Sequence, residues 1–142
     1  MSAHFARPDR HAALDRLTDR RMLRELAYVD GHWTAGDAGQ TFEVSDPATG
    51  AAIAWVSKLN ADQTSIAVDA AVRAWPAWRA LLPQERTARL RKWYELILAA
   101  KDDLALIMTL EQGKPLSESR GEIEYAASFI EWYAEEAKRL NA

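Results

Sequence analysis

The residue types that carry out covalent or metal chemistry are scarce in this chain. Its 142 residues include no cysteine, which excludes disulfides, thiolate metal sites and a cysteine nucleophile. The three histidines, His4, His11 and His32, are not spaced to meet on one helix face, so they predict no metal site. The glycines form no dinucleotide-binding turn, and the Gly-Lys pair at 113–114 precedes a proline rather than a phosphate loop. We therefore predict no catalytic residue, no cofactor-binding residue and no metal ligand in this chain.

Three polar clusters remain, and each has a simpler structural interpretation. Residues 46–50 (Asp-Pro-Ala-Thr-Gly) have the composition of a tight turn, because proline fixes φ and aspartate accepts backbone hydrogen bonds. Residues 101–103 (Lys-Asp-Asp) are typical of a helix start, where an acidic side chain caps free N–H groups. Residues 111–115 (Glu-Gln-Gly-Lys-Pro) fit a helix end whose dipole favours the ammonium of Lys114. We interpret all three clusters as structural.

Charged and aromatic side chains also favour structural roles. The formal charge of −3 gives no electrostatic case for a nucleic-acid or anionic-lipid partner, and no apolar stretch is long enough to span a membrane. Glu135 and Arg139 are spaced for a surface ion pair. Without a basic groove beside them, six aromatic side chains are expected to pack in the core rather than to stack on bases: Trp75, Trp78, Trp93, Tyr94, Trp132 and Tyr133.

The elements that position these residues change from strand to helix along the chain. Residues 9–26 place leucines at helical spacing among Arg and Asp, which predicts a helical arm. Asp30-Gly31 between apolar residues predicts a hairpin, because both turn positions favour positive φ. Residues 41–45 and 52–57 predict a second antiparallel pair, joined by the turn at 46–50.

Helices are predicted from residue 60 onward. Asn60 and Gln63 form the pattern of a capping box, and Pro76 is expected to end or kink the helix that they start. Pro83 suits the first turn of the next helix, and Gly113 suits the end of a third. The apolar side of the last helix reaches almost to the end of the chain; its members are Ile123, Ala126, Ala127, Ile130, Tyr133, Ala134 and Ala137.

This pattern predicts an α+β fragment that is mainly helical, with short antiparallel β-hairpins followed by about four helices. Two hairpins offer little sheet for amphipathic helices to cover. An apolar helix face that continues almost to the last residue must also pack on something. The pattern therefore indicates a piece of a larger α/β domain.

Specific stretches of this chain also resemble a known family. From about residue 18 onward, spacing and residue types resemble the amino-terminal part of the aldehyde dehydrogenase superfamily, whose cofactor-binding domain is Rossmann-like. The last of the resembling stretches looks most like the succinate-semialdehyde dehydrogenase branch. The stretches are residues 27–33, 42–50, 75–79, 108–116 and 120–139.

The resemblance implies descent from enzymes that oxidise an aldehyde to an acid with NAD or NADP. In that family the catalytic cysteine, the general-base glutamate and the cofactor loop lie downstream of the matched region. We therefore expect residues 1–26 to form a helical arm and residues 27–142 an incomplete N-terminal part of the cofactor-binding domain. We expect a truncated member that is inactive alone and binds no cofactor. The family's monovalent cation site would match Val44, Ser45 and Glu111.

Two alternatives remain open from the sequence: a stand-alone helical interaction module, or one half of a split enzyme. The expected partners are a second copy of the chain or a missing C-terminal part, with neither nucleic acid nor membrane. The composition favours the cytoplasm.

Overall fold

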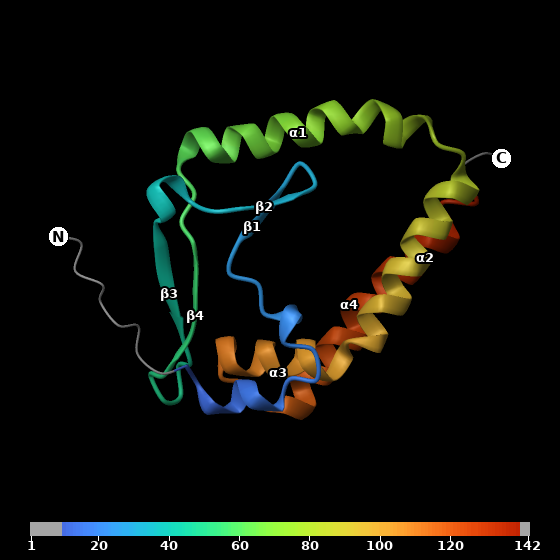
Figure 1. The fold of residues 1–142 in the computed structure, drawn as a ribbon. Helices are drawn as coiled ribbons and strands as arrows, with labels where there is room; N and C mark the ends of the chain where they lie inside the picture. Colours follow the sequence, from blue (N-terminus) through green and yellow to red (C-terminus); the bar gives the residue numbers. More distant parts are fainter. Residues whose placement is uncertain (1–9, 140–142) are drawn as a thin grey trace.

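The computed structural model describes residues 10–139, and these form four α-helices and two separate two-stranded antiparallel sheets (Figure 1). This confirms the predicted mainly helical α+β fragment. The strands are β1 (Ala27–Val29), β2 (His32–Thr34), β3 (Thr41–Ser45) and β4 (Ala52–Ser57). The helices are α1 (Ala61–Ala80), α2 (Pro83–Ala99), α3 (Lys101–Gln112) and α4 (Leu116–Glu136).

Local sequence signals define most element boundaries. Asp30 and Gly31 both have positive φ, as the two-residue turn between β1 and β2 requires. The side chain of Asn60 accepts from the backbone N–H of Gln63 at 2.9 Å and completes the predicted capping box of α1. Pro83 is the first residue of α2, and Gly113 closes α3 in the left-handed conformation.

Of the two outcomes expected at Pro76, an end or a kink of the first helix near Ala74, the structure excludes the end. Helix α1 continues to Ala80 with Pro76 inside it. A proline there leaves the carbonyl of Val72, four residues earlier, without its helical N–H partner. Val72 is exposed, so water can satisfy that carbonyl.

Within residues 10–139, no helix has the length and apolar character needed to cross a membrane.

The predicted helical arm also differs in the structure. Residues 1–9 lie outside the described residues, and the following segment forms two short 3-10 helices, Ala12–Arg16 and Arg20–Met22. Leu14 and Leu17 are buried, and this burial in the main core explains why the segment follows the body of the protein instead of extending as a helix. Their partners in the core cluster are Ile53, Ala54, Leu106 and Leu110.

A buried carboxylate joins this N-terminal segment to α3. Asp103 is 8% exposed and accepts hydrogen bonds from the backbone N–H groups of Thr18 and Asp19, each at 2.8 Å. The prediction that residues 102 and 103 cap a helix was therefore wrong, because the partners are distant in sequence. The neighbouring Asp102 instead forms an exposed ion pair with Arg120 at 2.8 Å.

Helix α4 lies beside α2 and packs on α3 (Figure 1). The hydroxyl of Thr87 in α2 donates to the carbonyl of Ala134 in α4 at 2.8 Å. The hydroxyls of Thr109 in α3 and Ser119 in α4 are 2.8 Å apart, and Ser119 is fully buried. Small residues at these contacts let the helices approach closely, so hydroxyl groups can reach across.

Replacing Asp103 with alanine is expected to lower the free energy of unfolding by about 2–3 kcal/mol, because two backbone N–H groups lose a charged acceptor. Asp102→Ala is the matched control: it removes the adjacent carboxylate from an exposed pair and should change stability little. Chemical denaturation followed by tryptophan fluorescence measures both. Equal effects of the two substitutions would contradict the role given to Asp103.

Candidate functional site

The turn between β3 and β4 is organised around one buried carboxylate. Asp46 accepts a hydrogen bond from the backbone N–H of Ala48 at 2.8 Å and from the hydroxyl of Thr49 at 2.9 Å. The bond from Ala48, then that from Thr49 and the nearby His11 lower the pKa of the Asp46 carboxyl below its ordinary value. These contacts confirm the structural interpretation of residues 46–50.

His11 connects the N-terminal segment to that turn. Its Nδ1 accepts a hydrogen bond from the backbone N–H of Ala13 at 3.1 Å, which places the proton of the neutral ring on Nε2. Nε2 lies 3.1 Å from the Asp46 carboxylate and donates to it. The backbone N–H of His11 also donates to the carbonyl of Ala52 at 2.8 Å. Sequence reasoning missed this pair because no local pattern relates residue 11 to residue 46.

The structure brings the cluster at 111–115 against the same turn. Gly113 has φ of 76°, and a Cβ atom there would lie 3.0 Å from Cγ of Pro47. Lys114 forms an ion pair with Glu122 of α4. The cluster at 111–115 thus forms the predicted end of α3 with Gly113 as its C-cap, and the ammonium of Lys114 pairs with an acidic side chain of α4.

Val44, Ser45 and Glu111 are the residues expected at a monovalent cation site, the first two through backbone oxygens and Glu111 through its carboxylate. Val44 packs against the core cluster, while Ser45 and Glu111 are exposed. Among residues 10–139, no group of three or more His, Cys, Asp or Glu side chains is arranged to hold a metal ion.

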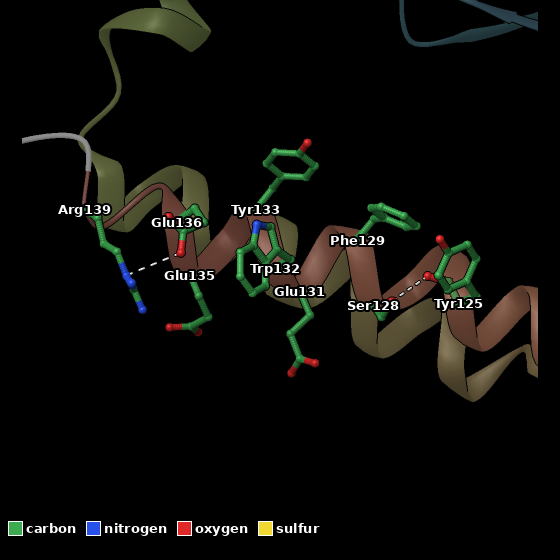
Figure 2. Close-up of a pocket in the computed structure, with 9 residues that line it drawn as sticks. All are labelled: Tyr125, Ser128, Phe129, Glu131, Trp132, Tyr133, Glu135, Glu136 and Arg139. Atoms are coloured by element: carbon green, nitrogen blue, oxygen red, sulfur yellow. Dashed lines mark hydrogen bonds and ion pairs between the residues drawn. The ribbon is translucent and has the colours of Figure 1, made fainter.

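Helix α4 presents a second apolar side to solvent, which we call the aromatic face of α4 (Figure 2). The prediction that the six aromatic side chains pack in the core was wrong: none is buried, and Trp132 and Tyr133 are each 63% exposed. For Trp132 and Tyr133 the reason is that the buried side of α4 is made of smaller residues, which fit the close contacts with α2 and α3. The residues that line the aromatic face are Tyr125, Ser128, Phe129, Glu131, Trp132, Tyr133, Glu135, Glu136 and Arg139.

Ion pairs near the end of this helix follow a different spacing from the predicted one. Glu135 pairs with Lys138 at 2.9 Å, and Arg139 pairs with Glu136 at 3.4 Å. The predicted pair between Glu135 and Arg139 was wrong, because the chain leaves α4 after Glu136 and the closer residues meet.

We compared the chain with models of protein families and with known proteins. The model of the aldehyde dehydrogenase family matches residues 33–142. The chain belongs to the aldehyde dehydrogenase family. It is similar to glutarate-semialdehyde dehydrogenase of Pseudomonas putida, with 55% identity over 124 residues that make up 87% of this chain and 26% of that protein. It is also similar to NADP(+)-dependent succinate-semialdehyde dehydrogenase of Escherichia coli, with 51% identity over 125 residues that make up 88% of this chain and 26% of that protein.

Solved structures of the family show the same fold in this region. A crystal structure of succinate-semialdehyde dehydrogenase from Burkholderia pseudomallei matches 87% of this chain with 54% identity and a TM-score of 0.84. The match covers 26% of that chain. The described fold therefore matches the N-terminal part of an aldehyde dehydrogenase, and the chain spans about a quarter of the length of the curated relatives it matches.

The aldehyde dehydrogenase family uses NAD or NADP, but the described residues do not fit a dinucleotide. A pyrophosphate is usually held where a glycine-rich turn leads from a parallel strand into a helix. Within residues 10–139 the strands pair only as antiparallel hairpins. The connection from β4 to α1 contains no glycine, and the side chains of Asn60 and Gln63 already cap the start of α1.

Asp46 should make stability depend on pH in the acid range. Because its pKa is lowered on folding, its contribution is complete above the ordinary value of 3.8 and is lost as pH falls through the folded pKa. In denaturation series between about pH 6 and pH 2, the stability gap between the wild type and Asp46→Asn should therefore narrow toward acid. Asp69→Asn removes an exposed carboxylate of α1 and serves as the control. A gap that stays constant over this range would contradict the assignment.

Gly113 and Gly121 provide a second pair of matched substitutions, each of glycine by alanine. Gly113→Ala should lower the free energy of unfolding by about 1–2 kcal/mol, because φ is positive there and the new methyl group meets Pro47. Gly121→Ala lies within α4, where a Cβ atom meets nothing within 4 Å, and should raise stability by about 0.5–1 kcal/mol. Thermal unfolding followed by circular dichroism measures both. The same sign for the two variants would overturn this account.

Proposed function

We propose that this chain supplies the N-terminal structural part of an NAD(P)-dependent dehydrogenase that oxidises a short semialdehyde, of the succinate or glutarate type, to a dicarboxylic acid. The observation that carries the proposal is the agreement of fold and sequence with semialdehyde dehydrogenases, at 51–55% identity over 124–125 residues. The proposal includes the cytoplasmic location that the composition favours.

In this role the chain provides rigidity rather than reacting groups. Its sequence has no cysteine, so a thiolate that attacks an aldehyde must come from another polypeptide segment. Asp46, His11 and Asp103 hold the N-terminal segment, the β3–β4 turn and α3 in fixed relative positions. We propose that the chain by itself oxidises no aldehyde and binds neither NAD nor NADP.

A chimera tests the proposal directly. The residues of this chain replace the aligned segment of the Escherichia coli succinate-semialdehyde dehydrogenase, and formation of reduced nicotinamide is followed with succinate and glutarate semialdehydes. We expect kcat/KM within about tenfold of the parent enzyme, because the grafted part shapes the scaffold and not the reacting atoms. The isolated chain should give no reduced cofactor above a heat-inactivated sample.

Two results would overturn the proposal. Turnover by the isolated chain would place reacting groups within it. A chimera that folds but is inactive would show that the chain does not serve as the scaffold of such an enzyme. The stand-alone interaction module would then be favoured, and the exposed aromatic face of α4 is the observation that supports it.

A further inference from the structure

The turn between β1 and β2 joins a side chain and a backbone group that can react with each other. Asp30 and Gly31 form the one Asp-Gly pair of the sequence, and no Asn-Gly pair occurs. The carboxyl carbon of an aspartate and the backbone nitrogen of the next residue can close a succinimide ring. A glycine in the second position favours this closure, because it places no Cβ atom beside the attacking nitrogen.

The backbone nitrogen of Gly31 is not used by the hairpin. The strand pairing ends at Val29 and His32, and the N–H of Gly31 between them has no acceptor among residues 10–139. A Cβ atom at Gly31 would meet nothing within 4 Å, so the space around the turn is open. Its φ of 82° lies in a region that glycine enters and leaves at little cost. The nitrogen can therefore turn toward the Asp30 side chain without breaking the strand pairing.

The carboxyl group of Asp30 is exposed and weakly held. Its side chain is 66% exposed, and Oδ2 lies 3.2 Å from Nη2 of Arg73 in α1, which runs past the tip of the hairpin (Figure 1). Such exposed ion pairs are weak, because water competes for both partners. The carboxyl group therefore leaves Arg73 readily and becomes available to the nitrogen of Gly31.

The two buried aspartates do not meet these conditions. Asp46 precedes a proline, whose nitrogen has no proton to release on ring closure. Asp103 precedes Leu104, whose N–H donates to the carbonyl of Ala100 at 3.0 Å within α3. Each of these two carboxylates also accepts two hydrogen bonds that hold it in place. Among the three, Asp30 is the aspartate at which both sequence and fold favour ring closure.

We propose that Asp30 is a site of spontaneous modification, where aspartate becomes isoaspartate through a succinimide. The nitrogen of Gly31 bonds to Cγ of Asp30, and its proton leaves with the carboxyl hydroxyl as water. A second water then cleaves the ring: attack at Cγ restores aspartate, whereas attack at the backbone carbonyl carbon leaves the chain running through Cβ and Cγ. One water is released and one is consumed. This inference does not depend on the proposed dehydrogenase role, because the reacting groups all belong to the turn.

The modification has a consequence for the hairpin. Isoaspartate adds one methylene group to the backbone between Val29 and His32, whose pairing requires a two-residue turn. A hairpin of two short strands has little stability to spare, so the contact between the rings of Tyr28 and Trp33, 5.1 Å apart, is lost with the pairing. The free carboxylate is then attached directly to Cα and no longer reaches Arg73. The modification therefore opens the hairpin and separates it from α1.

Storage of the folded chain at neutral pH, followed by peptide mapping, tests the modification. Trypsin releases residues 25–58 as one peptide, and a second protease that cuts before aspartate but not before isoaspartate reads each site. We expect a second peptide peak of unchanged mass, with progressive loss of cleavage before Asp30. Cleavage before Asp37 is the internal control and should persist, because the Cβ atom of Ala38 hinders ring closure. Unchanged cleavage before Asp30, or equal loss at both sites, would overturn the proposal.

Two substitutions test the route through the succinimide. Asp30→Asn keeps a residue that favours this turn and should convert faster than the wild type, since an amide releases ammonia more readily than an ionised carboxyl group releases an oxygen. Asp30→Glu keeps the carboxylate but would have to close a larger and less favourable ring, so its peptide should give no second peak of equal mass. A second peak from Asp30→Glu, or slower conversion of Asp30→Asn, would contradict this route.

Hydrogen exchange tests the consequence for the fold. The aspartate and isoaspartate forms of a peptide that covers the hairpin elute separately, so a single stored sample reports on both. We expect the isoaspartate form to lose the protection of β1 and β2, while peptides from α3 and α4 exchange as in fresh protein. Equal protection of the two forms would show that the hairpin tolerates the longer backbone and would overturn the proposed opening.

Discussion

The carboxylate of Asp103 is the contact on which the position of the N-terminal segment depends. Thr18 and Asp19 are separated from it by 85 and 84 residues, so the two hydrogen bonds close most of the chain into a loop. The buried leucines of the N-terminal segment then complete the core cluster against β4 and α3. A buried carboxylate is costly to desolvate, and two backbone donors offset that cost while providing directionality that apolar contacts lack.

Hydrogen bonds to a buried carboxylate also fix the backbone at the turn between β3 and β4. Asp46 has donors from its own turn and from His11, so local and distant groups fix one carboxylate together. Gly113 brings the end of α3 against this turn because it has no side chain to hold the helix away from Pro47. Short polar contacts, rather than a large core, therefore set the geometry of this part of the protein.

Features that depend on neighbouring residues were predictable from the sequence, and those that depend on distant partners were not. The hairpin at Asp30-Gly31, the capping box at Asn60 and the helix end at Gly113 follow from local backbone preferences. The partner of Asp103 was missed because nothing near residue 103 identifies residue 18. A helical projection does contain the signal for the aromatic face of α4, since Tyr125 and Trp132 fall opposite Ala134.

The family was recognisable from residue spacing over more than a hundred positions, whereas the burial of the aromatic side chains was not. Burial depends on what covers a surface, and an amphipathic pattern alone does not distinguish a core-facing side from an interface. The two apolar sides of α4 were therefore combined into one predicted core face. That single error accounts for the wrong placement of both Trp132 and Tyr133.

Helix α1 differs from α3 and α4 in how its stability is distributed. Ala70 is its one buried residue within the described chain, and an exposed ion pair joins Arg73 to Asp30 at 3.2 Å. The backbone hydrogen bonds and the capping box of α1, rather than burial of its side chains, provide most of the stabilisation of this helix. Such an element opens locally at a lower free energy than the packed helices. We therefore expect the backbone amides of α1 to exchange hydrogen with solvent before those of the α2–α4 pair.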